Sequence, residues 1–508
     1  MSRISRARTD PNKLAFHLIG GDSLSYGALE EQSCRTAHAF RAMGLRHGDH
    51  IALMIENRAE LIALVWAAQR TGLYYTLIPT HLMADEAAYL ASDSDALLIA
   101  TSHRFVDLWR SVRPQLAGVR HWLTVDAPHD GFPAWQDVIA NLPATPPADA
   151  LEGSAMLYSS GTTGRPKGIK KAIGTVPFGE EPLAAIYRER HVMDEDTVYL
   201  SPAPLYHAAP LRAVLAVNRL GGSVIALAKF EAEPLLAAID RYRVTHVQLV
   251  PTMLRRLLDL PAEVRARYDV SSLRRVIHAA APCPIDLKRD AIDWFGPIVT
   301  EYYGGTEGIG ATYIDSAEWL THQGSVGRAI MGDLHIVGED GAELPVGAVG
   351  DVYFGNGPRF AYHNAPEKLA AATHPLGWVT LGDIGRIDDE GYLYLVDRKS
   401  FVINSGGVNI YPADAEDALR SHPDVADVAV IGVPNRDFGE EVKAIVELRE
   451  GVLASDVLKD DLIAHCRARI SSVKCPRSID FIDIMPRSDA GKLLKGTLRQ
   501  AYWEQDKV

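Results

Sequence analysis

The sequence predicts an α/β protein with a large, multilayered N-terminal α/β region, a β-rich subdomain and a small α+β C-terminal domain. Two observations support this class. Strand-like and helix-like segments alternate from residue 26 to residue 278. Near Gly332 the pattern changes to short strand-like runs separated by glycines, and a small unit of helices and strands follows Asp397.

The first expected elements are an amphipathic helix over residues 26–43, a strand over 50–55 and a helix over 59–71. Further strands, with helical stretches between several of them, are expected over residues 96–101, 121–125, 197–201, 223–226, 246–250 and 275–278. This alternation favours layers joined by crossover connections.

The β-rich subdomain is expected to contain strands over residues 334–337, 350–354 and 392–396. The C-terminal unit is expected to contain a helix, two strands and a second helix, over residues 413–420, 425–432, 441–447 and 454–468. A junction near residues 397–400 divides the chain into predicted domains 1–397 and 398–508.

Composition excludes several classes of protein. The net charge of −13 has no long basic run to compensate it, which argues against a general nucleic-acid binder. The four cysteines lack metal-ligand spacing and are interpreted as reduced thiols. The N-terminus has no apolar signal region, and no apolar run reaches the roughly 18 residues of a membrane span. A cytoplasmic enzyme is expected.

Residues 158–169 read Tyr-Ser-Ser-Gly-Thr-Thr-Gly-Arg-Pro-Lys-Gly-Ile. Glycines let backbone N–H groups approach phosphate oxygens, hydroxyls donate hydrogen bonds or bind a metal, and lysine adds positive charge. The spacing differs from that of the common P-loop, which makes kinase or GTPase chemistry the weaker interpretation. The structural alternative is a glycine-rich surface turn.

Two further motifs suit a nucleotide. In Tyr303-Gly-Gly-Thr-Glu307, small residues beside an aromatic ring permit stacking, and the carboxylate is a hard oxygen ligand suited to Mg²⁺. In Gly382-Asp383, a carboxylate after a glycine can accept hydrogen bonds from two neighbouring ribose hydroxyls. Each motif taken alone is also compatible with an ordinary turn.

The C-terminal stretch Pro486-Arg-Ser-Asp-Ala-Gly-Lys492 precedes a second lysine, Lys495. A lysine at the end of a mobile loop can place positive charge on charge that develops during phosphoryl chemistry. The alternative is a solvated basic tail.

Together these motifs resemble, in order and spacing, the adenylate-forming superfamily of acyl-CoA synthetases, aryl-CoA ligases, luciferases and peptide-synthetase adenylation domains. The resemblance is closest to the acyl-CoA synthetases and covers essentially the whole chain. It implies an ATP-dependent carboxylate–CoA ligase that forms an acyl-adenylate and then an acyl-CoA thioester. It also implies that the C-terminal domain is mobile.

The same resemblance implies the ATP-binding residues: Ser159, Ser160, Gly161, Thr162, Thr163, Gly164, Lys167, Ala281, Tyr303, Asp383 and Arg398. Tyr303 would stack on adenine, and Thr306 would contact the α-phosphate. Glu307, with Thr162, would bind Mg²⁺. Lys492 is implied as the adenylation lysine, and Lys495 is the less favoured candidate.

The segment from Pro204 to Pro210 resembles the family region that gates the carboxylate pocket, with His207 as a positioning group and not a base. Small residues imply a roomy acyl pocket for a fatty, aromatic or other bulky acid: Ala208, Ala209, Ala279, Ala280 and Gly305. Gly406 and Gly407 are implied on the coenzyme A side. Ser400 and Phe401 occupy positions at which many relatives of the family carry charged residues. A charged side chain is therefore not expected to control the domain motion at this hinge.

The predicted partners are a small carboxylic acid, ATP and coenzyme A, with Mg²⁺ as cofactor. No nucleic acid and no integral membrane segment are expected, and a homodimer is left open. Three alternatives stand beside the ligase: an adenylating enzyme that loads a carrier-protein thiol, a luciferase-like oxygenase and a nucleotide-sensing protein without turnover.

Overall fold

The protein is described by a computed structural model over residues 3–159, 166–179, 183–405, 408–436, 438–488, 491 and 493–505. The chain divides into two compact units. The first holds the chain up to Ala279 with Arg289–Ile309 and Pro358–Ala371; the second holds Ala280–Lys288, Gly310–Gly357 and the chain from Ala372. The predicted α/β fold class is confirmed. The predicted boundary between residues 397 and 398 stays a prediction.

The larger parallel sheet of the first unit has the order β14-β13-β12-β10-β11-β1-β2. Its neighbours are parallel except β1 and β2, which are antiparallel. The strands are β1 Leu14–Leu18, β2 Ser23–Ser25, β10 Val198–Ser201, β11 Ser223–Ala226, β12 His246–Leu249, β13 Arg275–His278 and β14 Val299–Gly304. Because neighbouring strands run the same way, their carboxyl ends meet at one edge, where α/β proteins bind ligands.

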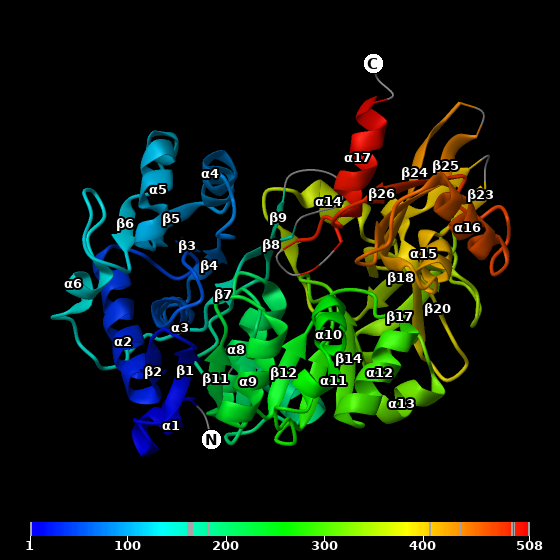
Figure 1. Cartoon of the computed structure of the whole chain (residues 1–508). Helices are drawn as coiled ribbons and strands as arrows, with labels where there is room; N and C mark the ends of the chain where they lie inside the picture. Colours follow the sequence, from blue (N-terminus) through cyan, green and yellow to red (C-terminus); the bar gives the residue numbers. More distant parts are fainter. Residues whose placement is uncertain are drawn as a thin grey trace. The chain divides into compact units, whose positions relative to one another are not determined.

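Helices connect these strands, and Figure 1 shows α8 and α9 along β11 and β12. The helices of this part of the chain are α1 Arg3–Thr9, α2 Tyr26–Ala42, α7 Leu183–Arg190, α8 Ala208–Leu220, α9 Ala232–Tyr242, α10 Pro251–Leu258, α11 Ala262–Arg265 and α12 Ile285–Phe295. The helix predicted over residues 26–43 is α2, and its start is capped because the Ser25 hydroxyl accepts from the Ala28 N–H at 3.2 Å.

A second parallel sheet in the first unit has the order β6-β5-β3-β4-β7. Its strands are β3 His50–Met54, β4 Tyr74–Leu77, β5 Ala96–Thr101, β6 His121–Thr124 and β7 Ser154–Ala155. Its helices are α3 Ala59–Arg70, α4 Ala84–Asp93, η1 His103–Phe105, α5 Val106–Val112, η2 Arg113–Gln115 and α6 Trp135–Ile139. Every residue of β3 is buried, as expected of a central parallel strand covered on both faces.

A small antiparallel sheet completes the first unit, with the order β19-β9-β8. Its elements are β8 Leu157–Ser159, β9 Lys167–Lys170 and β19 Ala361–Tyr362, and α14 Pro366–Ala371 follows. This sheet was not predicted from the sequence. Strands of two to four residues carry too little periodicity to be recognised, and β19 is about 190 residues away from its partner along the chain.

The second unit contains an antiparallel four-stranded sheet in the order β17-β18-β20-β21. Its elements, with the preceding β15–β16 pair, are β15 Ala311–Ile314, α13 Ser316–Thr321, β16 Arg328–Met331, β17 Asp333–Val337, β18 Gly350–Gly355, β20 Val379–Ile387, β21 Leu393–Arg398 and η3 Lys399–Phe401. The predicted β-rich subdomain is therefore confirmed.

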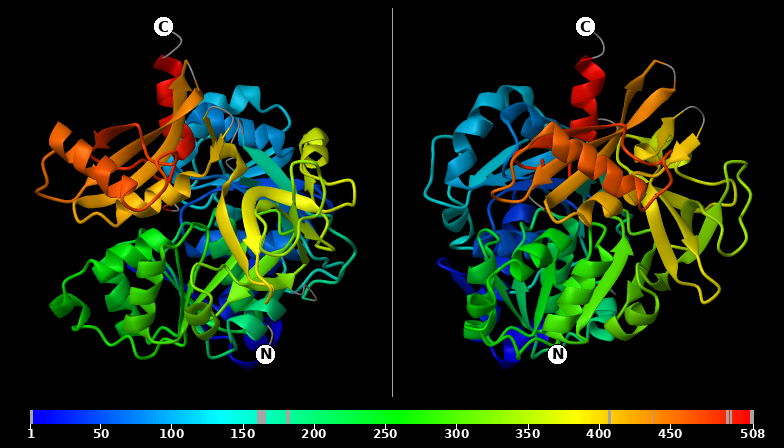
Figure 2. Two further views of the ribbon diagram at one scale, coloured as in Figure 1. Left: turned by 90° about the vertical axis from the view of Figure 1, so that its right-hand side faces the viewer. Right: turned by 45° about the vertical axis from the view of Figure 1, so that its right-hand side comes forward.

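The C-terminal part of the second unit is a sheet in the order β23-β22-β25-β24, with β26 parallel to β25. Val428 and Val430 face one core, whereas Ala429 and Ile431 face another that includes Leu498. Successive side chains of the strand therefore point to opposite faces of the sheet. The helices α15 and α16 pack on one face, and α17 packs on the other (Figure 2). The elements are β22 Ile403–Ser405, β23 Val408–Ile410, α15 Pro412–Arg420, β24 Val425–Asn435, β25 Gly439–Leu448, α16 Asp456–Arg467, β26 Ser478–Ile482 and α17 Lys495–Gln505.

The predicted helices and strands are confirmed, with small shifts at their ends. The strand predicted over residues 425–432 extends to Asn435 because it continues to pair with β25. Within the described ranges, no helix has the length and apolar character that a membrane crossing requires.

Candidate active site

The predicted phosphate loop joins two paired strands. Tyr158 lies opposite Gly168, and Ser159 lies opposite Lys167, so β8 and β9 form a hairpin. Gly168 cannot carry a side chain without crowding, because an added Cβ would lie 3.1 Å from the Tyr158 ring and 3.3 Å from the His363 Cβ. The tip of the hairpin, with Ser160, Gly161, Thr162, Thr163 and Gly164, lies outside the described residues.

The base of this hairpin is held by polar side chains of the first unit. The Tyr158 hydroxyl donates to Asp93 at 2.6 Å, and the Tyr89 hydroxyl donates to the Pro166 carbonyl at 3.1 Å. The Lys170 ammonium lies 3.0 Å from His50 Nε2. Burial, followed by the charge of Lys170, lowers the pKa of His50 to about 3, so the imidazole is neutral and accepts this hydrogen bond.

The predicted Tyr-Gly-Gly-Thr-Glu motif begins in β14 and continues into a turn. Tyr303 is a strand residue and is partly exposed. The Thr306 carbonyl accepts from the Arg212 guanidinium at 2.7 Å, and the Glu307 carboxylate accepts from the Tyr362 hydroxyl at 3.0 Å. Gly308 ends this turn with a φ of +63°. Residues with a side chain seldom adopt that backbone conformation, so glycine is favoured here.

Lys167 and Glu307 are brought to the same tyrosine. The Lys167 Nζ lies 4.9 Å from the centre of the Tyr362 ring, whose hydroxyl binds Glu307. A cation and a carboxylate that contact the same aromatic side chain lie close enough to act together. The cation can bind phosphate oxygens, and the carboxylate can bind the metal ion that accompanies them. The described residues contain no group of three or more His, Cys, Asp or Glu that could hold a metal. One carboxylate fits Mg²⁺, which takes few protein ligands and completes its shell with substrate phosphates and water.

The predicted acyl-side residues lie at the carboxyl ends of the larger parallel sheet. His207 is the N-cap of α8 in extended conformation, and Ala208 and Ala209 are the first residues of that helix. Ala279 follows β13, and Gly305 follows β14. Four of the five predicted acyl-pocket residues, together with His207, are therefore brought to one edge of the first unit.

The fifth predicted acyl-pocket residue, Ala280, and the predicted ATP-binding residue Ala281 belong to the second unit. Ala280 has φ +74°, in the left-handed region that non-glycine residues seldom adopt. Such strain tends to persist at functional positions, where the surrounding structure enforces it.

The predicted ribose-binding pair is formed within the second unit. Asp383 and Arg398 are register partners on β20 and β21, and the Arg398 Nε donates to Asp383 at 3.0 Å. The Asp383 side chain is buried, whereas Arg398 is partly exposed. Gly382 has φ +81° immediately before the aspartate, so a residue with a side chain would be strained at this bulge. The two residues are thus neighbours across a ladder, which their separation in sequence does not reveal.

Of the two candidate lysines near the C-terminus, the structure describes Lys495 but not Lys492. Lys492, Gly406 and Gly407 lie outside the described residues. Lys495 is part of an ion pair with Glu416 at 2.7 Å, with both side chains at least 88% buried. Its ammonium also faces the Phe401 ring at 5.6 Å. A lysine engaged in this way has a structural role, which supports the preference for Lys492.

Asp397 and Ser400, at the predicted junction between the domains, are partly buried. The backbone carbonyl of Ser400 accepts from Arg499 at 3.4 Å. Asp397 accepts from the Ala413 N–H at 3.2 Å, and burial raises the pKa of its carboxyl. The role of Ser400 as a hinge stays a prediction.

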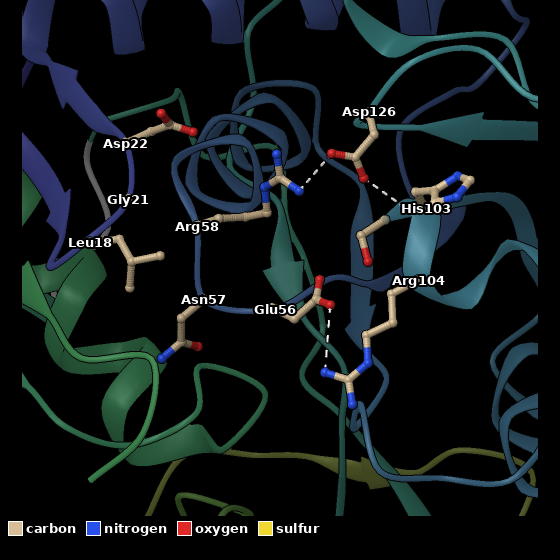
Figure 3. Close-up of a pocket in the computed structure, with 10 residues that line it drawn as sticks. Leu18, Gly21, Asp22, Glu56, Asn57, Arg58, His103, Arg104 and Asp126 are labelled. Atoms are coloured by element: carbon tan, nitrogen blue, oxygen red, sulfur yellow. Dashed lines mark hydrogen bonds and ion pairs between the residues drawn. The ribbon is translucent and has the colours of Figure 1, made fainter. Parts of the chain in front are cut away.

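A shallow groove of about 400 Å³ lies elsewhere in the first unit and contains none of the predicted site residues (Figure 3). Several of its charges are paired: Arg58 contacts Asp126 at 2.9 Å and the neighbouring Glu60 at 2.8 Å, and Arg104 lies 3.9 Å from Glu56. We interpret the groove as a structural ion-pair surface.

One residue that lines this groove, Asn57, forms hydrogen bonds with the segment that precedes the predicted acyl-pocket residues. The Asn57 amide donates to the carbonyls of Ala203 and Leu227 at 3.1 and 3.3 Å, and its oxygen accepts from the Leu205 N–H at 2.9 Å. Asn57 therefore shapes the segment that leads to His207. The sequence gives no signal for Asn57, Arg212 or Tyr362, because each makes its contact with a residue more than 50 positions away in the chain.

The parallel sheets define an α/β protein. The β8–β9 pair in the first unit and the Asp383–Arg398 pair in the second are each compatible with the nucleotide-binding roles that the sequence predicts. The model of the AMP-binding enzyme family matches residues 5–360, and that of the AMP-binding enzyme C-terminal domain matches residues 414–492. The chain therefore belongs to the AMP-binding enzyme family.

Individual relatives cover nearly the whole chain. A feruloyl-CoA synthase of Amycolatopsis is 32% identical over 98% of both chains. An indoleacetate–CoA ligase of Aromatoleum aromaticum is 32% identical over 97% of this chain and 96% of its own. The crystal structure of ATP-bound MatB from Rhodopseudomonas palustris matches with a TM-score of 0.84 and 29% identity, over 99% of both chains.

Proposed function

We propose that this chain is an ATP-dependent carboxylate–CoA ligase, an AMP-forming acid–thiol ligase. The observation that carries the proposal is the convergence of Lys167 and Glu307 on Tyr362, beside a phosphate hairpin, in a chain of the AMP-binding enzyme family. In the first step, a carboxylate oxygen bonds to the α-phosphorus of ATP and pyrophosphate leaves. In the second, the coenzyme A sulfur bonds to the acyl carbon, AMP leaves and the thiol proton is released.

The residues of the chain act mainly by position and charge. A carboxylic acid is already ionised near pH 7, so it needs no base, and His207 orients it. Lys167, with Thr162 and Thr163, holds the departing phosphates, and Lys492 stabilises charge that develops between the carboxylate and the α-phosphate. Asp383 and Arg398 hold the ribose, and Tyr303 stacks on adenine. When bound, Mg²⁺ would be held by Glu307 and Thr162 and would neutralise phosphate charge.

The domain division belongs to the same proposal. Residues 1–397 would form the adenylation domain, and residues 398–508 would form a mobile domain that carries Lys492 for the first step. Gly406 and Gly407 would serve the coenzyme A side in the second step. A cytoplasmic location fits the use of ATP and coenzyme A, and a homodimer stays a prediction.

The acyl substrate is proposed to be a bulky acid, fatty or aromatic. Ala208 and Ala209 at the start of α8, with Ala279 after β13, leave room where larger side chains would narrow the site. The two ligases compared above act on aromatic acids according to their names, which favours the aromatic class.

A panel of carboxylic acids tests the proposal through AMP release, measured with and without coenzyme A. We expect AMP release that depends on an aromatic or fatty acid, and a coenzyme A thioester as product. Turnover that needs a carrier-protein thiol in place of coenzyme A would favour the alternative adenylating enzyme. Light emission with oxygen would indicate a luciferase-like reaction. Nucleotide binding without acid-dependent pyrophosphate exchange would contradict the proposal that the chain is an enzyme and would favour a nucleotide-sensing protein.

Asn57→Ala is expected to raise the KM for the acid about tenfold, since it removes hydrogen bonds that are worth about 0.5–1.5 kcal/mol each. The KM for ATP should stay the same, because Asn57 contacts the segment before His207 and not the phosphate hairpin. Steady-state kinetics with each substrate varied in turn measure the two constants. Asn57→Asp keeps the acceptor for Leu205 but places a carboxylate oxygen against the carbonyls of Ala203 and Leu227, so it should raise the KM for the acid at least as much. Equal increases in both KM values would contradict the assignment.

A further inference from the structure

Tyr362 lies where two parts of the proposed site meet, on the short strand β19. It pairs with Ile169 of β9, and the neighbouring His363 N–H donates to the Gly168 carbonyl at 2.8 Å. The Tyr362 side chain is only 9% exposed. The tyrosine is therefore built into the sheet that carries the phosphate hairpin, although about 190 residues separate it from that hairpin.

Two contacts connect Tyr362 to charged groups of the site. Its hydroxyl donates to Glu307 Oε1 at 3.0 Å, and its ring lies 4.9 Å from the Lys167 ammonium. The phenol is the donor of this bond, and the Glu307 carboxylate is the acceptor. The bond occupies one oxygen of the carboxylate and orients the other.

The two residues that follow Tyr362 bind the end of α4. His363 Nε2 lies 2.9 Å from Asp95, and the Asn364 amide donates to the Asp93 carbonyl at 3.2 Å. The same Asp93 accepts from Tyr158 of β8 through its side chain at 2.6 Å. Both outer strands of the small sheet are thus attached to the end of α4, which leaves Tyr362 little freedom to move.

We propose that Tyr362 is a positioning residue that orients Glu307 for the divalent cation of the metal–nucleotide substrate and couples it to Lys167. The inference rests on the proposed function. The hydroxyl acts on the metal ligand, whereas the ring acts on the lysine, so the two contributions can be separated by substitution.

Tyr362→Phe tests the hydroxyl and keeps the ring. Binding of Mn²⁺, used in place of Mg²⁺, is measured by electron paramagnetic resonance with a saturating non-hydrolysable ATP analogue. We expect the Kd for Mn²⁺ to rise about tenfold or more, the range typical of lost partners to metal ligands. The Kd for the metal-free analogue should stay unchanged, because the ring contact with Lys167 remains. A purely structural role would not separate these two constants.

Tyr392→Phe is the matched control, since Tyr392 makes the same kind of bond, to Glu318 at 3.1 Å, in the second unit. It should leave both constants unchanged. In a Glu307→Gln background, Tyr362→Phe should add little further loss, because the two residues act through one bond.

The outcomes separate the inference from the proposed function. Wild-type Mn²⁺ affinity in Tyr362→Phe, an equal loss of metal and nucleotide affinity, or additive losses in the double variant would each overturn the role of Tyr362. A wild-type chain that binds no Mn²⁺–nucleotide would overturn the proposed function and the inference with it. Tyr362→Leu in the Glu307→Gln background tests the ring: metal-free nucleotide affinity unchanged from Glu307→Gln alone would overturn the coupling to Lys167. Should the Tyr362 variants unfold, Glu307→Gln alone decides, because wild-type Mn²⁺ affinity in that variant would overturn the role of the Tyr362–Glu307 bond.

Discussion

Lys492→Ala is expected to slow acyl-adenylate formation by about 10²–10³-fold, the usual cost of removing one group that stabilises developing charge. Formation of the thioester from a supplied acyl-adenylate should remain largely intact, because that step no longer involves the α-phosphate attack. Acid-dependent pyrophosphate exchange measures the first step. Release of AMP from synthetic acyl-adenylate and coenzyme A measures the second.

Lys495→Ala is the control for this experiment. Its ammonium forms an ion pair with Glu416, and both side chains are largely buried. We expect the variant to lower the free energy of unfolding and to affect both half-reactions alike. If Lys492→Ala also impaired the two steps equally, Lys492 would not be the adenylation lysine. A selective loss in Lys495→Ala would transfer the role to Lys495.

Arg219→Ala is expected to lower the free energy of unfolding by about 3–5 kcal/mol, since removing one member of a buried ion pair leaves the other charge uncompensated. Two bonds of 2.9 and 2.8 Å connect its guanidinium to Glu152, and the side chains are 9% and 7% exposed. The guanidinium also lies 5.0 Å from the Trp66 ring. Urea unfolding followed by circular dichroism measures the change.

Arg243→Ala provides the matched comparison. Its pair with Asp269 is close, at 2.6 Å, but the side chains are 57% and 51% exposed. Solvent screening limits such pairs to about 0.2–1 kcal/mol. A loss for Arg219→Ala as small as that for Arg243→Ala would show that the buried pair contributes little.

The position of Glu152 connects this stability effect to the site. Glu152 also accepts from the Gly179 N–H at 2.6 Å, and it lies just before β7, which leads to the phosphate hairpin. The neighbouring Gly153 has no room for a side chain, because a Cβ would lie 2.4 Å from the Leu73 carbonyl. The chain that enters the hairpin is therefore held by a buried charge pair and by close backbone packing.

Long, periodic elements could be predicted from the sequence with small errors at their ends. The run at residues 96–101 coincides with β5, and the predicted helix over 59–71 is α3. These segments are recognisable because each is buried along a whole face, so burial determines its residue pattern. The small sheet of β8, β9 and β19 lacks that signal. Its strands are too short for a pattern, and their pairing depends on distant residues.

The chemistry of the site divides in the same way. Nucleotide binding could be predicted from the motifs alone, because glycines, hydroxyls and charged residues that are contiguous in the chain indicate one ligand without any tertiary contact. The family followed from the order of those motifs. Three contacts could not be predicted and become visible in the folded chain: Asp383 and Arg398 are cross-strand neighbours, Lys495 is bound to Glu416, and Tyr362 connects Lys167 with Glu307. Such contacts join residues that are far apart in the chain, and their geometry exists only once the strands have paired and the side chains have packed.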